Sequence, residues 1–380
     1  MNKRWQRRLL IGLGLLVAFG LRVYRLGDQN IWWDEAYSIW VARMGLVEAT
    51  LHTATDTHPP FYYWLLIPWS QVVGETEFAL RYLSVLIAQI TVALMVPFGR
   101  RLSGSRWIGV AALWFLAFSR FHIWWSQEIR MYVLAALWAM LSLYCVTRVA
   151  SEDVAARHWI TWAGWILTTV GAFATYYATI VIAIIENLFI LFVGLKYKKR
   201  LRFWGRWIAA QGLVALFLLP WLVMALPRMQ TWSAAQAPVP LPFVFELHVV
   251  LLSLGISTEL GQYLIPALLM TGIGLVGLIR ELIWMRHSQE KPALPKKGAA
   301  LLLGLGLLIP PLFIWVLTQP RSFLYTPRVE ARYLLPLAPL FSVFLAWSLA
   351  GWLRSQKAWR WVGLVLCVVF LVGLGWMLPQ

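Results

Sequence analysis

The sequence has little charge and almost no cysteine. Only 13% of its 380 residues are charged and 61% are hydrophobic, whereas soluble domains have about 25% charged and roughly 45–50% apolar residues. Cys145 and Cys367 both lie inside apolar runs, so neither a disulfide framework nor a thiolate metal site is expected. No stretch is long and polar enough for a separate soluble domain. The composition therefore predicts an integral membrane protein.

Acidic residues are also scarce, with 16 Asp and Glu against 33 Lys and Arg and a net charge of +17. In a soluble domain this excess would suggest nucleic acid as a partner. Here the basic residues alternate with apolar runs, and most of them fall on one side of the membrane if the N-terminus is cytoplasmic. This asymmetry is what the positive-inside rule expects. We therefore predict a multi-pass protein of the cell membrane with a cytoplasmic N-terminus and no nucleic-acid partner.

Apolar runs that suit a bilayer, at about 20 residues each, predict about eleven transmembrane helices, within a range of ten to twelve. The fold class is then an all-α polytopic bundle, in one domain over 1–380. The predicted spans are 9–21, 78–97, 107–119, 129–149, 159–175, 177–194, 207–226, 261–280, 299–317, 333–353 and 360–378. The first follows a basic start and lacks a cleavage site, so it is predicted to be an uncleaved signal-anchor.

The longest loop outside the cytoplasm, 22–77, carries two acidic clusters. One is the pair Asp34-Glu35, and the other is the run Asp56-Thr57-His58-Pro59-Pro60. The interior of the loop is rich in Trp, Leu and Val, which is typical of short amphipathic helices at the membrane interface. Such helices would hold the carboxylates close to the membrane surface.

More polar residues gather at the same predicted side of the membrane. They are Arg81 near the end of one span; Glu128, Arg130 and Tyr132 at the mouth of another; and Arg321, Tyr325, Arg328, Glu330, Arg332 and Tyr333 around the start of 333–353. Glu128 and Tyr132, four residues apart, are expected to share one helix face. Guanidinium groups suit a phosphate, and a carboxylate suits a hydroxyl that must lose a proton. Together they indicate glycosyl transfer from a polyprenyl-phosphate sugar.

The motifs also resemble a known group of enzymes. The Asp34-Glu35 pair, the Asp56-x-His58-Pro59-Pro60 run, Arg81-x-x-Ser84 and Arg332-Tyr333-Leu334-x-Pro336 are similar, in order and spacing, to the GT-C superfamily of membrane glycosyltransferases. Within it they are most like family 39, the protein O-mannosyltransferase and aminoarabinose-transferase-like group. The resemblance implies a GT-C bundle with a long first extracytoplasmic loop and an active site on that side.

The resemblance also implies roles for the residues. Asp34 would be the catalytic base in an inverting displacement, supported by Glu35, and the Asp56–Pro60 motif would shape the site. Arg81 would bind the donor phosphate. The donor would be a polyprenyl-phosphate sugar held among membrane lipids, and the acceptor a lipid, a glycan or a protein. The loop at 227–260 is too short for the soluble sugar-binding domain of the protein O-mannosyltransferases.

The pattern leaves several roles open. Arg130, Arg328 and Arg332, like Arg81, are candidates to stabilise the leaving phosphate, and Tyr132 and Tyr333 to bind substrate. Alternatively, Arg81 and Arg130 anchor spans in the interface, Arg328 and Arg332 pair with Glu330, His58 orders the Pro-Pro turn, and Glu128 is a helix N-terminal acid. A divalent cation, Mg or Mn, is a candidate cofactor because hard cations prefer oxygen ligands. Its candidate ligands are Asp34, Asp56, His58 and Glu128.

Two features inside the spans have competing explanations. Glu186, midway along 177–194, is either functional or a hydrogen-bonding link between helices. The run Gly272-x-Gly274-x-x-Gly277 matches the dinucleotide-binding pattern by letter, but it lies within a span, where close helix packing explains it. The competing functions are a secondary transporter or lipid flippase, and a scaffold. A transporter would place polar residues near the midplane, whereas this chain concentrates them at one face.

Overall fold

The computed structural model is a bundle of helices. It describes residues 3–151, 158–197, 199, 201–229, 237–255, 260–287, 296–319, 328–354, 361 and 365, and these contain no strand. The elements are α1 (Lys3–Val23), α2 (Trp33–Arg43), α3 (Leu46–Thr53), α4 (Phe61–Val73), α5 (Glu77–Ser103), α6 (Arg106–Ala117), α7 (Arg120–Ser126), α8 (Tyr132–Ser151), α9 (His158–Thr175), η1 (Tyr177–Thr179), α10 (Ile180–Lys196), α11 (Leu201–Met229), α12 (Leu241–Leu254), α13 (Leu260–His287), α14 (Lys296–Leu317), η2 (Ala331–Leu337) and α15 (Ala338–Leu353).

The helices confirm an all-α, multi-pass membrane fold. Within the described ranges, seven helices are long and apolar enough to cross a membrane, or eight if the bent pair α6–α7 is one span. Each predicted span up to 333–353 coincides with a helix. The predicted total of eleven is not confirmed, and the last span, 360–378, lies outside the described residues apart from two positions.

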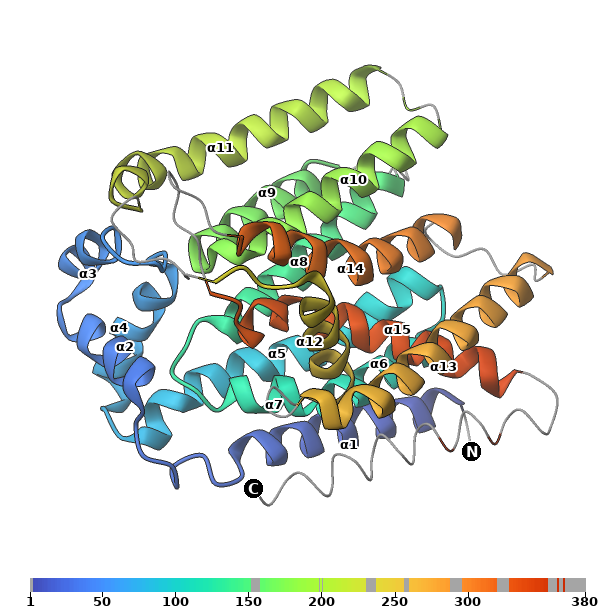
Figure 1. Cartoon of the computed structure of the whole chain (residues 1–380), viewed down its shortest axis with the longest axis horizontal. Helices are drawn as coiled ribbons and strands as arrows, with labels where there is room; N and C mark the ends of the chain where they lie inside the picture. Colours follow the sequence, from blue (N-terminus) through green and yellow to red (C-terminus); the bar gives the residue numbers. More distant parts are fainter. Residues whose placement is uncertain are drawn as a thin grey trace.

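Two helices form the centre of the bundle. In α15, taken with η2, 89% of the most apolar stretch is buried, and α8 is also largely buried. By contrast only 22% of the corresponding stretch of α11 is buried, and α11 lies at the margin of the bundle in Figure 1. Its outward side chains are large and apolar, as expected for a surface that faces lipid. The apolar residues of the chain therefore divide between a packed core and a surface that faces lipid.

Close packing of α13 on α15 explains the glycine run in the sequence. A Cβ at Gly274 would meet Phe344 at 2.8 Å, and one at Gly277 would meet the backbone oxygen of Ser348 at 2.5 Å. Small residues allow such close approach of two helices in a membrane. The prediction that this run serves packing is confirmed at these two positions.

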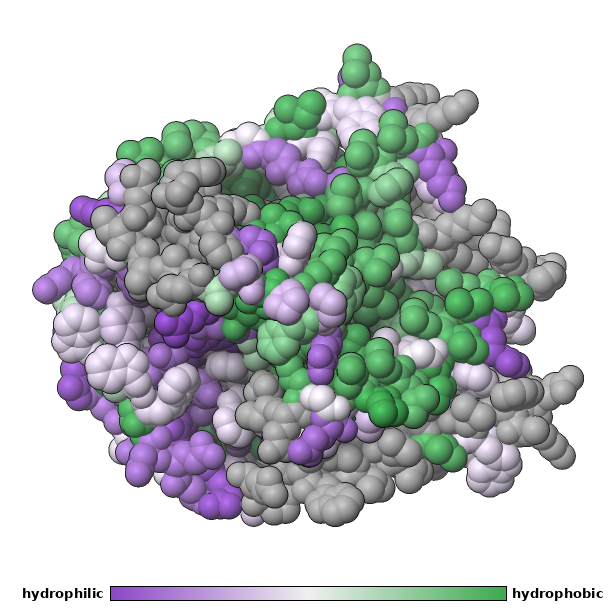
Figure 2. All heavy atoms as spheres, viewed as in Figure 1, coloured by the Kyte–Doolittle hydropathy of each residue, from purple (hydrophilic) through white to green (hydrophobic). Residues whose placement is uncertain are grey.

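The connection between α1 and α5 folds into three short helices at one end of the bundle. In Figure 1, α2, α3 and α4 lie together at the left, beyond the ends of the long helices. Figure 2 shows hydrophilic side chains gathered over this end, with an apolar band across the middle of the face shown. Several large apolar side chains on these short helices still point outward, among them Trp33, Val47 and Val72. The short helices predicted for this loop are present.

The helix predicted over 107–119 ends in a sharp bend. α6 ends at Ala117, and α7 starts at Arg120 after a bend of 60°. The bend leaves the last carbonyls of α6 without helical partners, and the fully buried Arg22 of α1 donates to two of them, Leu116 and Ala117, at 3.0 and 3.2 Å. It also contacts Nδ1 of His122 at 3.0 Å. The guanidinium thus stabilises a break that the pattern of apolar residues does not predict.

The predicted loop at 227–260 contains a helix, α12. With 14 residues, it is shorter than the roughly 20 that a bilayer needs. Its residues Val244, Leu247 and Leu251 are buried, and it packs against α13, α14 and η2. α12 therefore supports η2, which carries Arg332.

Candidate active site

The first turn of α2 places its two acids in different surroundings. Carboxylates at this position are stabilised by the positive end of the helix dipole, and Glu35 also accepts a hydrogen bond from the backbone N–H of Trp32 at 3.4 Å. Successive helix residues point about 100° apart. Glu35 is therefore fully buried, while the side chain of Asp34 remains 24% exposed. Only Asp34 is accessible to a substrate.

Glu35 forms a buried ion pair with Arg81. Nε and Nη2 of Arg81 donate to the two carboxylate oxygens at 2.8 and 2.6 Å. The other N–H groups of Arg81 donate to the carbonyls of Leu26, Gln29 and Asn30, and Glu35 also accepts from the backbone N–H of Ile129 at 3.0 Å. A guanidinium has five N–H groups, and here all five are used. Arg81 has none left for the phosphate that the resemblance implies, and the pair ties α2 to α5 and to the turn after α7.

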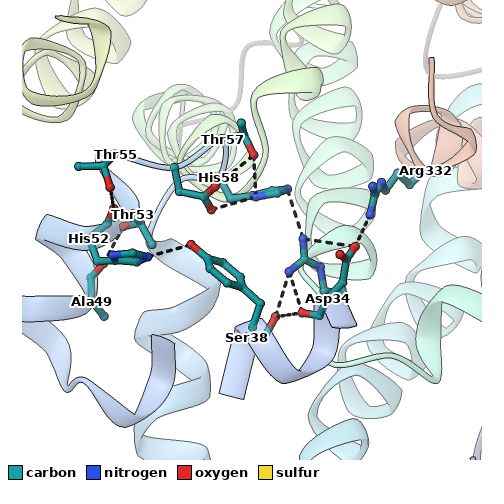
Figure 3. A network of polar contacts seen from close by, with 12 residues as sticks. Asp34, Ser38, Ala49, His52, Thr53, Thr55, Thr57, His58 and Arg332 are labelled. Atoms are coloured by element: carbon teal, nitrogen blue, oxygen red, sulfur yellow. Dashed lines mark hydrogen bonds and ion pairs between the residues drawn. The ribbon is translucent and has the colours of Figure 1, made fainter. Parts of the chain in front are cut away.

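Asp34 faces two arginines from distant parts of the chain. Its Oδ2 accepts a hydrogen bond from Nη1 of Arg332 at 2.7 Å and lies 4.0 Å from Nη2 of Arg130. Figure 3 shows the Asp34 carboxylate turned toward Arg332. Nη1 of Arg332 also donates to the hydroxyl of Tyr132 at 2.7 Å, and Nε of Arg332 is paired with Glu330. The structure thus brings together residues that lie almost 300 positions apart in the sequence.

Arg130 is held by the backbone and by neutral groups. Its Nη1 donates to the Asp34 carbonyl and to the Ser38 hydroxyl, both at 3.1 Å. Its Nη2 lies 3.3 Å from both the Tyr132 hydroxyl and Nε2 of His58. The side chain is 2% exposed, and its buried Nε has no hydrogen-bond partner in the described part of the chain. Arg130 is therefore a positive charge held in place, and its Nε–H has no hydrogen-bond acceptor among the described residues.

The Asp56–His58 pair orients Arg130. Nδ1 of His58 lies 3.2 Å from Oδ2 of Asp56. Because arginine only donates, Nε2 of His58 must be the acceptor, and we assign the imidazole proton to Nδ1. Burial lowers the pKa of His58, and the charge of Arg130 lowers it further against the opposing effect of Asp56. Burial would raise the pKa of Asp56, but hydrogen bonds from His58 and Thr57 outweigh it and hold the pKa at about 2.

Glu128 lies in the turn between α7 and α8. The prediction that it shares a helix face with Tyr132 is wrong, as is the alternative of a helix N-terminal acid, because α8 begins only at Tyr132. The backbone of the turn is bound to α5, because the Glu128 carbonyl accepts a hydrogen bond from the Ser84 hydroxyl at 2.6 Å. Burial, and then the nearby Glu35, raise the pKa of the Glu128 carboxyl to about 8. Glu128 is therefore mostly neutral at neutral pH.

Aromatic side chains pack against His58 and Tyr132 of this cluster. The ring of Tyr176 is stacked on His58 with a centroid distance of 6.5 Å, meets Tyr132 edge-on at 5.2 Å, and lies 6.0 Å from Tyr333. Trp125 packs edge-on against Tyr132 at 4.8 Å. Tyr176 was not among the predicted site residues. Its position, where two predicted spans meet on the same side as the acidic loop, is a signal that could have identified it.

The predicted metal ligands do not come together. Across the described ranges, no three His, Cys, Asp or Glu side chains form a group that could hold a metal ion. The physical reason is that each candidate already has a different environment: Asp34 pairs with Arg332, Asp56 binds His58, and Glu128 is buried in its turn. The residues present therefore do not fit a divalent cation. Arg328 is exposed, and no ion pair joins it to the described residues of this cluster; Arg321 and Tyr325 lie outside the described residues.

Glu186 lies inside the bundle, away from this cluster. It is fully buried, and its two oxygens accept hydrogen bonds from the Ser142 hydroxyl at 2.7 Å and the indole N–H of Trp165 at 3.0 Å. These donors belong to α8 and α9, whereas Glu186 belongs to α10. The contacts favour the explanation that Glu186 links three helices.

Comparisons with known proteins give matches by structure alone. No protein-family model matches the chain, and no curated protein matches it in sequence. The structure of ArnT from Cupriavidus metallidurans bound to undecaprenyl phosphate has a TM-score of 0.60 at 14% identity, covering 97% of this chain and 64% of ArnT. The oligosaccharyltransferase AglB from Archaeoglobus fulgidus, in complex with an inhibitory peptide and a dolichol-phosphate, has a TM-score of 0.61 at 13% identity, covering 99% of this chain and 55% of AglB.

These likenesses confirm the predicted fold: the chain has the GT-C fold of membrane glycosyltransferases. The chain spans between 55% and 64% of the length of the two proteins described. At this level of identity the comparison establishes the architecture, and the chemistry must be argued from the residues of this chain.

Proposed function

We propose that the chain is a glycosyltransferase that moves a sugar from a polyprenyl-phosphate donor to an acceptor outside the cytoplasm. One observation carries the proposal: on a GT-C fold, the accessible carboxylate of Asp34 lies 2.7 and 4.0 Å from the guanidinium nitrogens of Arg332 and Arg130. A base for the acceptor and cations for a leaving phosphate are the two requirements of this reaction. The acceptor class remains a lipid, a glycan or a protein.

The proposed step is a single displacement at the anomeric carbon. The acceptor oxygen forms a bond to that carbon while the bond from the carbon to the phosphate oxygen breaks, and the acceptor proton passes to Asp34. The leaving group is polyprenyl phosphate, a monoester that carries one more negative charge than the phosphodiester of the donor. Attack from the side opposite the phosphate inverts the configuration. A phosphate is a weakly basic leaving group, so it needs positive charge more than the general acid of a glycosidase.

Arg332 and Arg130 are the proposed phosphate ligands. Nη2 of Arg332 makes no hydrogen bond to any described residue, and Nε of Arg130 is a buried N–H without a partner. One hydrogen bond to a charged group contributes about 1.5–3 kcal/mol. The solved structures of ArnT with undecaprenyl phosphate and of AglB with a dolichol-phosphate support a polyprenyl phosphate as the ligand class.

Glu35 and Arg81 are proposed to position Asp34 and make no substrate contact. Both are buried, and every N–H of Arg81 is already used. Because Asp34 is adjacent to Glu35, the ion pair fixes where the base lies relative to the turn that carries Arg130. No metal takes part in the proposed step, since the residues of the site do not fit one.

The test is transfer of labelled sugar by the purified full chain in proteoliposomes. A panel of polyprenyl-phosphate sugars is supplied with membrane lipids, glycans and protein from a cell envelope, and both labelled product and released polyprenyl phosphate are measured. We expect product with at least one donor, and an anomeric configuration opposite to that of the donor. Absence of both product and released polyprenyl phosphate with every donor of the panel would contradict the proposal.

A further inference from the structure

Arg332 is bound to the group that the proposed reaction needs as its base. Its Nη1 donates to Oδ2 of Asp34 at 2.7 Å, and its Nε pairs with Glu330. The lone pairs that Asp34 directs at Arg332 are not available for a proton, and its negative charge is compensated. Arg332 is also the most accessible cation of the cluster for a phosphate. The two requirements, a free base and a bound phosphate, therefore meet at one side chain.

We infer that Arg332 is shared between Asp34 and the donor phosphate, so that donor binding draws the guanidinium from Asp34 and frees the base for the acceptor. This inference rests on the proposed function and adds an order of events to it. The donor binds first, and the acceptor meets an active base only in the donor complex. Arg332 thus has two states, one bound to carboxylate and one bound to phosphate.

The charges of the site support an exchange of partners. Among the residues that the structure describes, the cluster contains two guanidinium charges, on Arg130 and Arg332, and three carboxylates, on Asp34, Asp56 and Glu330. His58 is neutral because burial and Arg130 lower its pKa. A phosphate adds a further negative charge to a cluster that already has an excess of one. Phosphate binding is favourable only if an existing pair loosens, because like charges brought together in a partly buried site repel strongly.

The exposures of the pairs indicate which one loosens. In the Glu35–Arg81 pair, Glu35 is 0% and Arg81 is 3% exposed, and Arg130 is 2% exposed. Separating these groups would leave buried charges without a counter-ion, so the separated state would be strongly disfavoured. Asp34 and Arg332 are 24% and 18% exposed. Both can be solvated when they part, and Nη2 of Arg332, which has no hydrogen bond to a described residue, can make the first contact with a phosphate. The Asp34–Arg332 pair is therefore the one that exchanges.

The test is a double-mutant cycle on ligand binding, which needs neither the sugar nor the acceptor. The probe is undecaprenyl phosphate, and its affinity for the full chain in phosphatidylcholine nanodiscs is measured by native mass spectrometry. If Asp34 competes for Arg332, Asp34→Asn should raise the affinity about tenfold, the size of a modest charge coupling. Glu330→Gln, which removes the negative charge paired with Nε of the same guanidinium, should also raise it.

The second arm separates competition from simple repulsion. Repulsion between Asp34 and the phosphate would make Asp34→Asn tighten binding whether or not Arg332 is present. Competition predicts that the gain disappears in an Arg332→Gln background; if that variant does not fold, Arg332→Lys, which keeps the charge but loses the forked geometry, should reduce the gain. The matched control is Asp28→Asn, which removes an exposed carboxylate paired with Arg25 in the same connection and should leave the affinity unchanged.

The outcomes distinguish the inference from the function beneath it. If wild type binds undecaprenyl phosphate and Asp34→Asn binds it equally well or more weakly, Arg332 bridges the two anions and the inference is wrong, while the proposed function stands. If the gain persists unchanged without Arg332, the inference is wrong as well. If neither wild type nor any variant binds the probe, the proposed donor class itself is wrong.

Discussion

Two carboxylates in different regions of the molecule, Asp34 and Glu186, have different kinds of partner. At the hydrophilic end, Asp34 is partly exposed and is paired with a charged side chain, Arg332, that is itself accessible. Inside the bundle, Glu186 is fully buried and accepts hydrogen bonds from two neutral donors, Ser142 and Trp165. Both carboxylates have hydrogen bonds to side chains, so partner count alone does not distinguish them.

The difference lies in what each carboxylate could do next. Separating Glu186 from its donors would leave unsatisfied polar groups in an apolar interior, at about 1–3 kcal/mol for each group. Asp34 can lose Arg332 to a phosphate and remain solvated. Glu35, next to Asp34, resembles Glu186 because it too cannot exchange its partner: Arg81 is buried and all its N–H groups are hydrogen-bonded. Accessibility together with a replaceable partner identifies the reactive group, and the following changes test that distinction.

The largest effect is expected for Asp34→Asn. An amide cannot take the acceptor proton, so transfer should fall by about 10²–10⁴-fold, the usual contribution of a general base. The measurement is release of polyprenyl phosphate by folded protein in proteoliposomes, with Asp28→Asn as the matched control of unchanged activity. Wild-type rates in the Asp34 variant would remove it as the base.

The next effect, on stability, is expected for Glu35→Gln. The change leaves the buried charge of Arg81 without its counter-ion, which should lower the free energy of unfolding by about 3–5 kcal/mol. Thermal melting of the purified protein measures it. The control is Glu75→Gln, which breaks the exposed pair with Arg43 and should give no measurable shift, since exposed pairs contribute little. Equal shifts in the two variants would contradict the contrast between buried and exposed pairs.

A pH effect is expected at Glu128, whose pKa is raised to about 8 by burial and by Glu35. In the unfolded chain a glutamic acid has a pKa of about 4.3. Between these values the folded state holds a proton that the unfolded state has lost, so stability falls as the pH rises. The contribution is on the order of a few kcal/mol. Melting curves at pH 5 to 9 should show a decline in wild type that is smaller in Glu128→Gln, and parallel declines would refute the assignment.

The sequence predicted the convergence at the hydrophilic end better than its internal contacts. Asp34, His58, Arg130 and Arg332 were grouped because their positions relative to the apolar runs place them on one side of the membrane, and the structure brings them into contact. The pattern of spans fixes that side, but it does not fix how neighbouring helices are rotated. For that reason the saturation of Arg81 by Glu35 and backbone carbonyls was not predicted.

The irregular elements were also missed for a physical reason. The break between α6 and α7 depends on Arg22, which satisfies carbonyls more than 90 positions away. Tyr176 enters the site because η1 and η2 lie against each other. Both features come from tertiary contacts, which periodicity along the chain does not record. A metal site was considered from ligand types alone, but its candidate ligands already have other partners, Asp34 in Arg332 and Asp56 in His58.

The smallest effect is expected for Glu186→Gln. The amide oxygen can still accept from Ser142 or Trp165, but the amide N–H₂ would face the other donor, so the loss should be about 1–3 kcal/mol of stability. The rate of transfer for each folded molecule should stay at the wild-type value, because Glu186 touches no group of the hydrophilic end. The matched control is Thr168→Val on α9, whose hydroxyl bonds only to carbonyls of its own helix, Gly164 and Trp165, and which should shift melting less. A loss of transfer in Glu186→Gln without loss of folded protein would mean that the interior carboxylate has a part in function, and that saturation by neutral donors is not the mark of a structural acid.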